Sequence, residues 1–455
     1  MTASTFGLLF TAIILNANRV VSSGSSSRNF CDSVETGYRC NTQISHSWGQ
    51  YSPWFAVPSE IHLAPPKDCE VTFANVLSRH GGRDPTQSKT TTYRALITSI
   101  QQSATTFPDD YKFLQHYNYT LGADDLTDFG RQEMINSGKH FVDRYGRLVR
   151  KHPPFVRSAG QDRVVESAQK WLTGVAQSLK TQTKAIDVII PEATTSNNTL
   201  SHDTCPAFEN GAYSDLGSNA QKAWSTKFAP TIQKRINGAL GTNLTTSSII
   251  NLMDLCPYDT IATLSTTRSP FCQLFTEDEW HSYDYYQTLG KFYGYGAGNP
   301  LGATQGVGYV NELLARLTGT PVTDHTNTNA TLDSNPATFP LHNQVYADFS
   351  HDNDMSGIFA ALGLYNNTKL SNTTAESADK AGFSAAWTVP FAARMYIEKL
   401  QCKHDKEEFV RVIVNDRVHP LGFCGGDKYG RCTLSRFVGS QGFARSGGNW
   451  EKCYI

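Results

Sequence analysis

Three apolar stretches of this chain each end in a polar cluster, and a helical pattern follows each cluster. The stretches cover residues 71–77, 155–157 and 345–349, and apolar residues recur at helical spacing beyond them. This repeated order of strand, loop and helix is typical of α/β proteins, in which helices cover a sheet. Ligands bind such sheets at the edge where strands end, and helix N-termini there favour an anion. We therefore expect the three clusters to converge at one site.

The polar clusters carry cations, a possible nucleophile and a carboxylate. Arginine offers planar, bidentate donors that stay charged at any relevant pH, which suits the recognition of phosphate. Two glycines in the first cluster allow the backbone to approach an anion closely. The residues concerned are Arg79, His80, Gly81, Gly82 and Arg83 in the first cluster, Arg163 after the second, and His351 and Asp352 in the third.

Each of these residues also has a simpler interpretation. Two arginines four positions apart are more often solvated charges on a surface loop, and Asp352 could cap the helix that follows it. Arg163 could pair with Asp162 or Glu166 on an exposed helix face, which is worth only about 0.3–0.5 kcal/mol. Arg157, on the strand side of the second cluster, competes with Arg163 as the functional arginine.

The N-terminus and the cysteines indicate a secreted protein. Residues 6–15 form a short apolar run followed by small and polar residues, so we predict a signal peptide at 1–23. Ten cysteines without a C-x-x-C pair suit disulfides better than zinc. N-x-S/T acceptors for glycans, which fit passage through the secretory pathway, occur at Asn118, Asn197, Asn243, Asn329, Asn366 and Asn372.

Charge and length limit the remaining possibilities. The 455 residues carry 40 Lys plus Arg against 41 Asp plus Glu, so no global field favours nucleic acid or a membrane surface. We expect an extracellular, soluble monomer whose partner is a phosphorylated small molecule. For the domains we predict an arm at 24–68, an α/β domain at 69–185 and 302–455, and a smaller, mainly α-helical domain at 186–301.

The seven residues 79–85 read Arg-His-Gly-x-Arg-x-Pro with two variable positions, directly after an apolar strand. This pattern resembles the active-site signature of the histidine acid phosphatases. The wider stretch 71–97 is similar to the fungal phytase branch of that family, of the 3-phytase type, and the likeness extends over nearly the whole chain. It implies the histidine phosphatase fold, in which helices flank a mixed central sheet and a smaller α-rich domain is added.

The resemblance assigns roles to the polar residues. It implies that His80 is the nucleophile of a phosphohistidine intermediate and that Asp352 is the general acid, with Arg79, Arg83, Arg163 and His351 as the phosphate clamp. No metal or other cofactor is expected, because arginines supply the charge that a metal supplies elsewhere. The resemblance also implies disulfides that join Cys31 to Cys40, Cys69 to Cys402, Cys205 to Cys453, Cys256 to Cys272, and Cys424 to Cys432.

The sequence departs from this branch around the substrate. Asp84 replaces a residue that is usually tyrosine, and a carboxylate pointing inward would repel a phosphate dianion. Of the lysines that line the pocket in the relatives, the comparable segments keep only Lys89, Lys112 and Lys291. We expect a secreted acid phosphatase acting on myo-inositol hexakisphosphate. The alternatives are a broad-specificity phosphatase with a weak phytate preference and a non-catalytic secreted binding glycoprotein.

Overall fold

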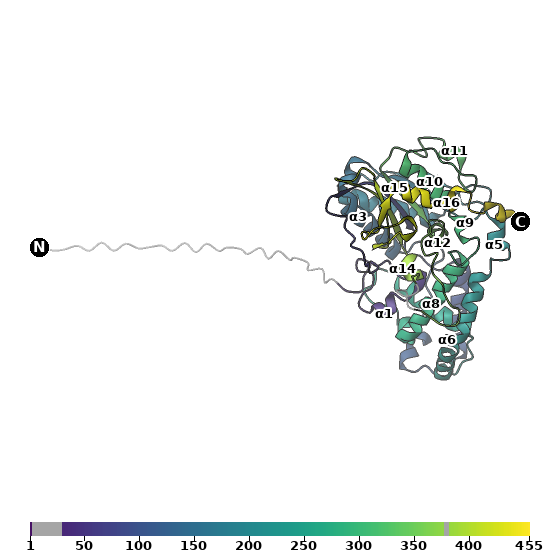
Figure 1. Cartoon of the computed structure of the whole chain (residues 1–455). Coiled ribbons are helices and arrows are strands. Elements are labelled where there is room, and N and C mark those ends of the chain that lie inside the picture. The colour runs from purple at the N-terminus through teal and green to yellow at the C-terminus, as the bar shows by residue number, and fades with distance from the viewer. Residues whose placement is uncertain (2–29, 377–381) are drawn as a thin grey trace. The chain divides into compact units, whose positions relative to one another are not determined.

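The computed structural model describes Met1, residues 30–376 and residues 382–455. A compact unit extends from Cys31 to Ile455 (Figure 1). The predicted signal peptide at 1–23 lies outside the described residues apart from Met1, as do the first residues of the predicted arm. Among the described residues, no helix combines the length and the apolar character needed to cross a bilayer.

The centre of the compact unit is an eight-stranded mixed sheet. Its strands follow the order β3-β2-β4-β1-β5-β6-β7, and β8 pairs with β6. The strands are β1 (Cys69–Arg79), β2 (Phe155–Ala159), β3 (Val188–Ile190), β4 (Val345–Ser350), β5 (Arg394–Cys402), β6 (Phe409–Val414), β7 (Arg417–Val418) and β8 (Arg431–Thr433). The predicted mixed sheet is confirmed.

Parallel pairing of β4 with β1 and β2 aligns the ends of three strands. Arg79 at the end of β1 lies opposite Ser350 at the end of β4, and Ser158 of β2 lies opposite Phe349 of β4. Every residue of β2 and β4 is buried, as expected for parallel strands that are covered on both faces. The three polar clusters predicted from the sequence therefore share one edge of the sheet.

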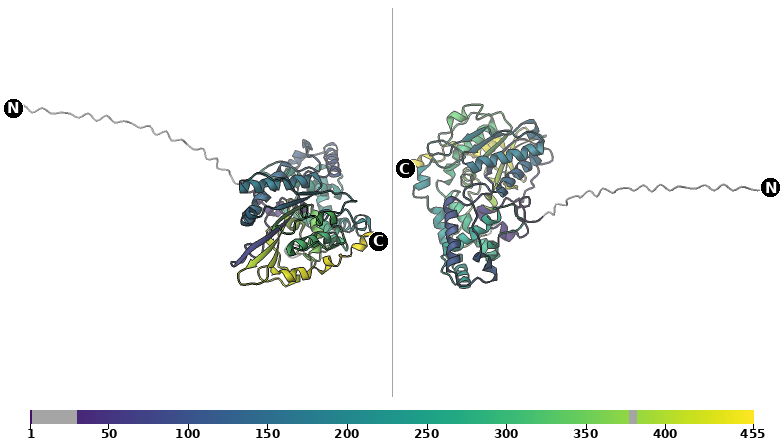
Figure 2. Two further views of the ribbon diagram at one scale, coloured as in Figure 1. Left: turned by 90° about the horizontal axis from the view of Figure 1, so that it is seen from above. Right: turned by 180° about the vertical axis from the view of Figure 1, so that it is seen from behind.

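Helices cover both faces of this sheet (Figure 2). On one side α3 packs closely on α4, because Gly138 and Gly174 leave no side chain between the two backbones. A Cβ atom at either glycine would collide with a backbone carbonyl of the partner helix. The helices that cover the sheet include α3 (Asp128–Lys151), α4 (Asp162–Leu179), α9 (Gly302–Gln305), α10 (Val307–Thr318) and α12 (Asp352–Ala361).

A second group of helices packs around aromatic residues, with α6 and α8 side by side (Figure 1). Trp48 of the arm meets Trp280 of α8 edge to face, with ring centroids 6.4 Å apart. The longer helices of this group are α2 (Gln87–Ser103), α6 (Leu216–Leu240), α7 (Thr246–Thr260) and α8 (Glu277–Gly294). Since α2 and the arm also contribute to this core, the predicted boundaries of a helical domain at 186–301 stay a prediction.

Short helices connect these elements. The α-helical ones are α1 (Thr42–Ser45), α5 (Pro206–Asn210), α11 (Ala330–Asp333), α14 (Ala385–Thr388), α15 (Leu434–Ser440) and α16 (Gly442–Arg445). The 3₁₀ turns are η1 (Gly49–Tyr51), η2 (Asp109–Gln115), η3 (Pro270–Leu274), η4 (Gly422–Cys424) and η5 (Trp450–Tyr454).

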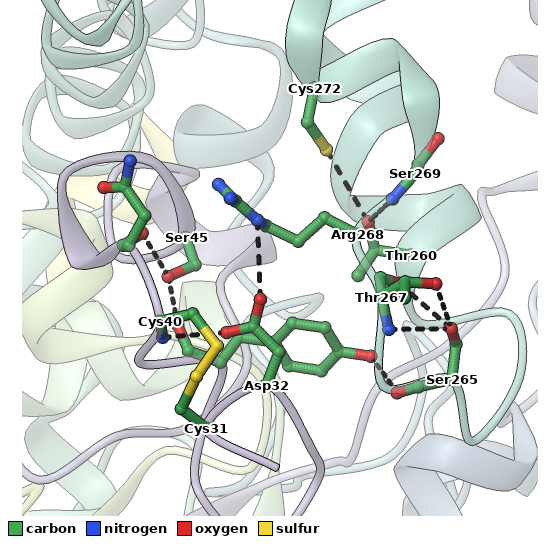
Figure 3. Close-up of polar contacts among 12 residues, drawn as sticks. Cys31, Asp32, Cys40, Ser45, Thr260, Ser265, Thr267, Arg268, Ser269 and Cys272 are labelled. Carbon is green, nitrogen blue, oxygen red and sulfur yellow. Dashed lines mark hydrogen bonds and ion pairs between the residues drawn. A yellow bond between two sulfur atoms is a disulfide. The ribbon is translucent and has the colours of Figure 1, made fainter.

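The start of the described arm is attached to the loop that follows α7 (Figure 3). Asp32 accepts a hydrogen bond from the backbone of Cys40 at 2.8 Å, and its other oxygen lies 3.5 Å from Nε of Arg268. The hydroxyl of Tyr38 donates to the carbonyl of Ser265 at 2.5 Å. These contacts fix the start of an arm whose sequence has no periodic pattern.

All five disulfides implied by the family resemblance are present. The bond from Cys69 to Cys402 joins the start of β1 to the end of β5. Cross-links between residues far apart in the chain stabilise a fold mainly by restricting its unfolded state. Of the six glycan acceptors, Asn329 is half-buried and the other five are exposed.

Candidate active site

A cleft of about 280 Å³ lies at the sheet edge where the three clusters meet. His80 and Arg83 reach it from the loop after β1, Arg163 from the first turn of α4, and His351 and Asp352 from the junction of β4 and α12. Arg79, the last residue of β1, is fully buried beside this cleft. The structure therefore brings together the predicted nucleophile, acid and phosphate clamp.

His80 is held as a neutral ring with one free nitrogen. Its Nδ1 lies 2.9 Å from the carbonyl oxygen of Gly81, which can only accept, so Nδ1 carries the proton. In the neutral ring Nε2 then has a free lone pair. Burial, followed by the nearby cations of Arg79 and Arg163, lowers the pKa of His80 well below its ordinary value. The ring is therefore suited to act as a nucleophile in acid.

Asp352 is an ionised carboxylate between two cations. Its Oδ2 lies 2.6 Å from Nζ of Lys291 and 3.4 Å from a guanidinium nitrogen of Arg79. Burial by itself would raise the pKa of Asp352, but the charges of Arg79 and Lys291 hold it well below its usual range. Lys291, predicted from the sequence to bind the substrate, contacts the candidate acid directly.

The three arginines present donors that nothing in the described part of the chain satisfies. The Nε groups of Arg79, Arg83 and Arg163 are buried and have no hydrogen-bond partner there. Buried polar groups in proteins are almost always paired, and each exception calls for an explanation. A tetrahedral anion in the cleft would supply oxygen acceptors to charged donors of this kind.

His351 is paired with the carboxylate of Glu192, a residue that no motif of the sequence indicates. Both carboxylate oxygens of Glu192 lie 3.1 Å from Nε2 of His351. Glu192 follows β3, and its Oε1 also accepts a hydrogen bond from the backbone N–H of Gln161 at 2.9 Å. A fourth strand end therefore contributes to the site.

The Asp84 side chain does not point toward the phosphate clamp. Its carboxylate lies against Gly122, whose backbone N–H donates to it, and a side chain at Gly122 would collide with Oδ2. Burial raises the pKa of Asp84. The guanidinium of Arg83 donates a hydrogen bond to the backbone carbonyl of Asp84 at 2.7 Å. Asp84 therefore repels a phosphate dianion in the clamp only weakly, unlike the inward-pointing carboxylate that the sequence left open.

The three predicted lysines have different surroundings. Lys89 lines a second cleft of about 320 Å³ and lies 3.2 Å from a carboxylate oxygen of the buried Asp254. Lys291 lines both clefts, which also share Gln50. Lys112 is exposed on η2 and lines neither cleft. The structure thus separates Lys112 from the other two.

Arg157, the competitor of Arg163, has a structural role. It is buried on β2, with its guanidinium 2.8 Å from Asp348 of β4 and 2.6 Å from Glu312 of α10. Arg163 instead lines the cleft, and its nearest carboxylate, Asp124, is 4.0 Å away.

Two buried side chains, Glu133 and Arg79, support the loop that carries His80 through four hydrogen bonds. The carboxylate of the buried Glu133 accepts hydrogen bonds from the backbone of Gly82 at 3.0 Å and of Trp54 at 2.8 Å. Arg79 donates to the carbonyl of Val389 at 2.8 Å and also to the carbonyl of Gln50 in the arm. The arm and α3 therefore hold the loop that carries His80.

Potential metal ligands gather at two places in the described residues. Ligand atoms of His202, Asp203 and Glu209 lie within 4.8 Å of one another, but His202 already forms an ion pair with Glu209 at 2.6 Å. The other group contains Cys31 and Cys40, whose sulfurs are joined in a disulfide. Neither group requires a metal for its explanation.

Comparison with known proteins gives a consistent result. Residues 70–415 match the histidine phosphatase superfamily, branch 2. A phytase A from Aspergillus fumigatus is 50% identical over 98% of each chain, and one from Aspergillus awamori is 52% identical over 94% of each chain. Among solved structures, a phytase from D. castellii shares the fold with a TM-score of 0.75 at 22% identity, covering 90% of this chain and 87% of that one.

The chain therefore belongs to the histidine phosphatase superfamily, branch 2. This membership confirms the predicted family, the predicted fold and the predicted enzyme class, a phosphoric monoester hydrolase. Several curated relatives that are about 50% identical to it over nearly its full length are phytases.

The orientation of Asp84 predicts a small effect of removing its charge. In Asp84→Asn, kcat/KM for a phosphate monoester should change by less than about fivefold, because partly exposed charges interact by at most about 1 kcal/mol. Asp125→Asn, which removes an exposed carboxylate from the adjoining loop, is the matched control. A more than tenfold gain in Asp84→Asn alone would show that Asp84 repels the substrate.

The raised pKa of the buried Glu133 predicts that this residue stabilises the fold more in acid than at neutral pH. Burial raises the pKa of Glu133 from 4.5 to about 7, so its contribution is complete below pH 4.5 and is lost as the pH rises through about 7. The free energy of unfolding, measured in urea, should fall in the wild type when the pH is raised from about 5 to about 8. In Glu133→Gln this fall should be smaller, by on the order of 2 kcal/mol. Asp143→Asn, an exposed carboxylate on the same helix, should keep the wild-type pH dependence. Equal slopes in the wild type and Glu133→Gln would contradict this assignment.

Proposed function

We propose that this protein is a phytase that removes phosphate from myo-inositol hexakisphosphate through a phosphohistidine intermediate on His80. The observation that carries the proposal is the set of unpaired arginine donors around a neutral imidazole. Donors of this kind match the equatorial oxygens of a phosphoryl group in transfer. The full-length similarity to phytases at about 50% identity supports the substrate.

In the first half of the reaction, Nε2 of His80 attacks phosphorus and the bond from phosphorus to the ester oxygen breaks. The electron pair of that bond leaves with the ester oxygen, which takes a proton from Asp352. Arg79, Arg83 and Arg163 stabilise the charge on the three non-bridging oxygens of the phosphoryl group as it is transferred to His80. In the second half, Asp352 takes a proton from water, water attacks phosphorus, and the bond to Nε2 breaks.

The proton on Asp352 must come with the substrate, because Lys291 and Arg79 keep the free carboxylate ionised. A phosphate monoester loses its second proton near pH 6, so below about pH 6 the bound ester still carries a proton. Its negative charge also offsets the cations that hold Asp352 ionised. Both effects favour activity in acid, where His80 is still neutral.

The second cleft supports a substrate with more than one phosphate. It adjoins the first through Gln50 and Lys291 and adds Lys89, so a ring held at His80 could place further phosphates near these cations. Lys89 is engaged with Asp254 and Lys291 with Asp352, which reduces the charge offered to the ring. A broad-specificity phosphatase with a weaker phytate preference is therefore the second candidate.

Several expectations from the sequence remain part of this proposal. We expect the protein to be secreted after removal of residues 1–23, to carry glycans at the exposed acceptors, and to act as a monomer. The exposed positions of Asn118, Asn197, Asn243, Asn366 and Asn372 support the glycans.

A comparison of two substrates tests the function. At acidic pH the wild type should release phosphate from phytate with a higher kcat/KM than from 4-nitrophenyl phosphate, because the second cleft contacts only the larger substrate. His80→Ala should lower both activities by about a thousandfold or more, as expected when a nucleophile is removed.

The outcomes separate the candidates. Equal or better kcat/KM for 4-nitrophenyl phosphate would favour the broad phosphatase over the phytase. Release of phosphate that survives in His80→Ala would contradict the mechanism. If the wild type releases phosphate from neither substrate, the non-catalytic binding glycoprotein would be the remaining candidate.

A further inference from the structure

Glu192 connects two parts of the candidate clamp. It follows β3, which pairs in parallel with β2, so it lies at the same edge of the sheet as the other strand ends. Its side chain is 6% exposed, and both its oxygens lie 3.1 Å from Nε2 of His351. The backbone N–H that also donates to Glu192 belongs to Gln161, the residue before α4, whose first turn carries Arg163.

We propose that Glu192 is a positioning residue that keeps His351 doubly protonated, so that His351 binds phosphate as a cation through Nδ1–H. The inference rests on the proposed binding of a phosphate group in the cleft. It assigns Glu192 no contact with the substrate, because its oxygens face His351 and Gln161.

The proton positions follow from the contacts. An ionised carboxylate only accepts hydrogen bonds, so Nε2 of His351 must donate to Glu192. Nδ1 can then donate to a phosphate oxygen only when the ring carries both protons, since a neutral ring would present a lone pair to the anion. In the described part of the chain Nδ1 makes no hydrogen bond, although His351 stands at the N-cap of α12. It is free to serve the cleft that His351 lines.

Glu192 is ionised under the conditions in which the site would work. Burial by itself would raise the pKa of Glu192, but the hydrogen bond and charge of His351 hold it below its ordinary value. The charge of the carboxylate is therefore available in acid.

The charges around His351 make such a partner necessary. The neighbouring arginines and Lys291 repel a positive charge on the ring of His351, whereas Glu192 is the carboxylate in direct contact with that ring among the described residues. The titratable and charged groups that line this cleft beside His351 and Glu192 are Tyr51, His80, Arg83, Arg163, Lys291, His202 and Asp203, together with Asp352 and Asp354 on α12 itself.

The test measures the affinity of inorganic phosphate as a function of pH. In Glu192→Gln, which keeps an acceptor but removes the charge, the inhibition constant of phosphate against 4-nitrophenyl phosphate should rise about tenfold near pH 7. Near pH 4.5 it should stay within about threefold of the wild type, because the higher proton concentration itself favours the cationic form of an imidazole. In the same variant, the decline of kcat/KM at alkaline pH, its alkaline limb, should begin at a lower pH than in the wild type.

Two further variants serve as controls. Glu192→Asp keeps the charge and should restore the pH dependence of the wild type. Glu209→Gln removes the carboxylate from the other histidine pair beside the cleft, that of His202, and should leave the alkaline limb in place. Calorimetric binding of phosphate gives a readout that does not depend on turnover.

Each result has a defined meaning. A uniform loss of phosphate affinity at both pH values, or an unchanged profile in Glu192→Gln, would overturn the role of Glu192 while leaving the proposed function intact. If the wild type neither binds phosphate nor hydrolyses the ester, the proposed function fails, and the inference fails with it.

Discussion

Parallel pairing of β4 with β1 and β2 is the constraint on which the site depends. The register places Arg157 of β2 opposite Asp348 of β4, and their ion pair is buried between the strands. Arg316 of α10 contacts the same carboxylate at 2.6 Å. Removing one partner of a buried ion pair typically costs about 3–5 kcal/mol, because the other charge is left without compensation. The register is therefore well defined, and with it the relative positions of the strand ends.

Positive charge is concentrated at the sheet edge where β1, β2 and β4 end, and the helix N-termini at this edge also favour anions. Three arginines and Lys291 surround His80 and Asp352, and only part of their charge is matched by carboxylates in the described residues. Burial, together with the cations that would bind a phosphoryl group, lowers the pKa of His80 and keeps its imidazole neutral, and the charges of Arg79 and Lys291 keep Asp352 ionised. Binding and catalysis are therefore coupled, since an arriving phosphate anion offsets the positive charges that keep Asp352 ionised.

Much of this arrangement could be predicted from the sequence. Apolar runs that end in polar clusters mark β1, β2 and β4, and the topology of α/β sheets brings their ends together. The choice of Arg163 over Arg157 came from the family resemblance, because both arginines flank the same strand end. The disulfide pairing also depended on that resemblance, since the spacing of ten cysteines does not select one pairing.

Other parts of the site have no local signal. Glu192 follows a strand of only three residues, and Glu133 lies within a long amphipathic helix, where an acidic residue is ordinary. Gln50 belongs to an arm without periodicity, and its role is a backbone carbonyl, which no side-chain pattern indicates. The outward direction of Asp84 depends on the neighbouring loop at Gly122. These features arise from tertiary contacts, so they require the structure.

The most direct test of this account is a search for the covalent intermediate. The wild type would be mixed with substrate for a few milliseconds and denatured at alkaline pH, where phosphohistidine survives, and its peptides would be analysed by mass spectrometry. The account predicts a phosphoryl group on Nε2 of His80, lost on acid treatment and missing from His80→Ala. A phosphoryl group on another residue, or turnover without any phosphorylated peptide, would contradict it.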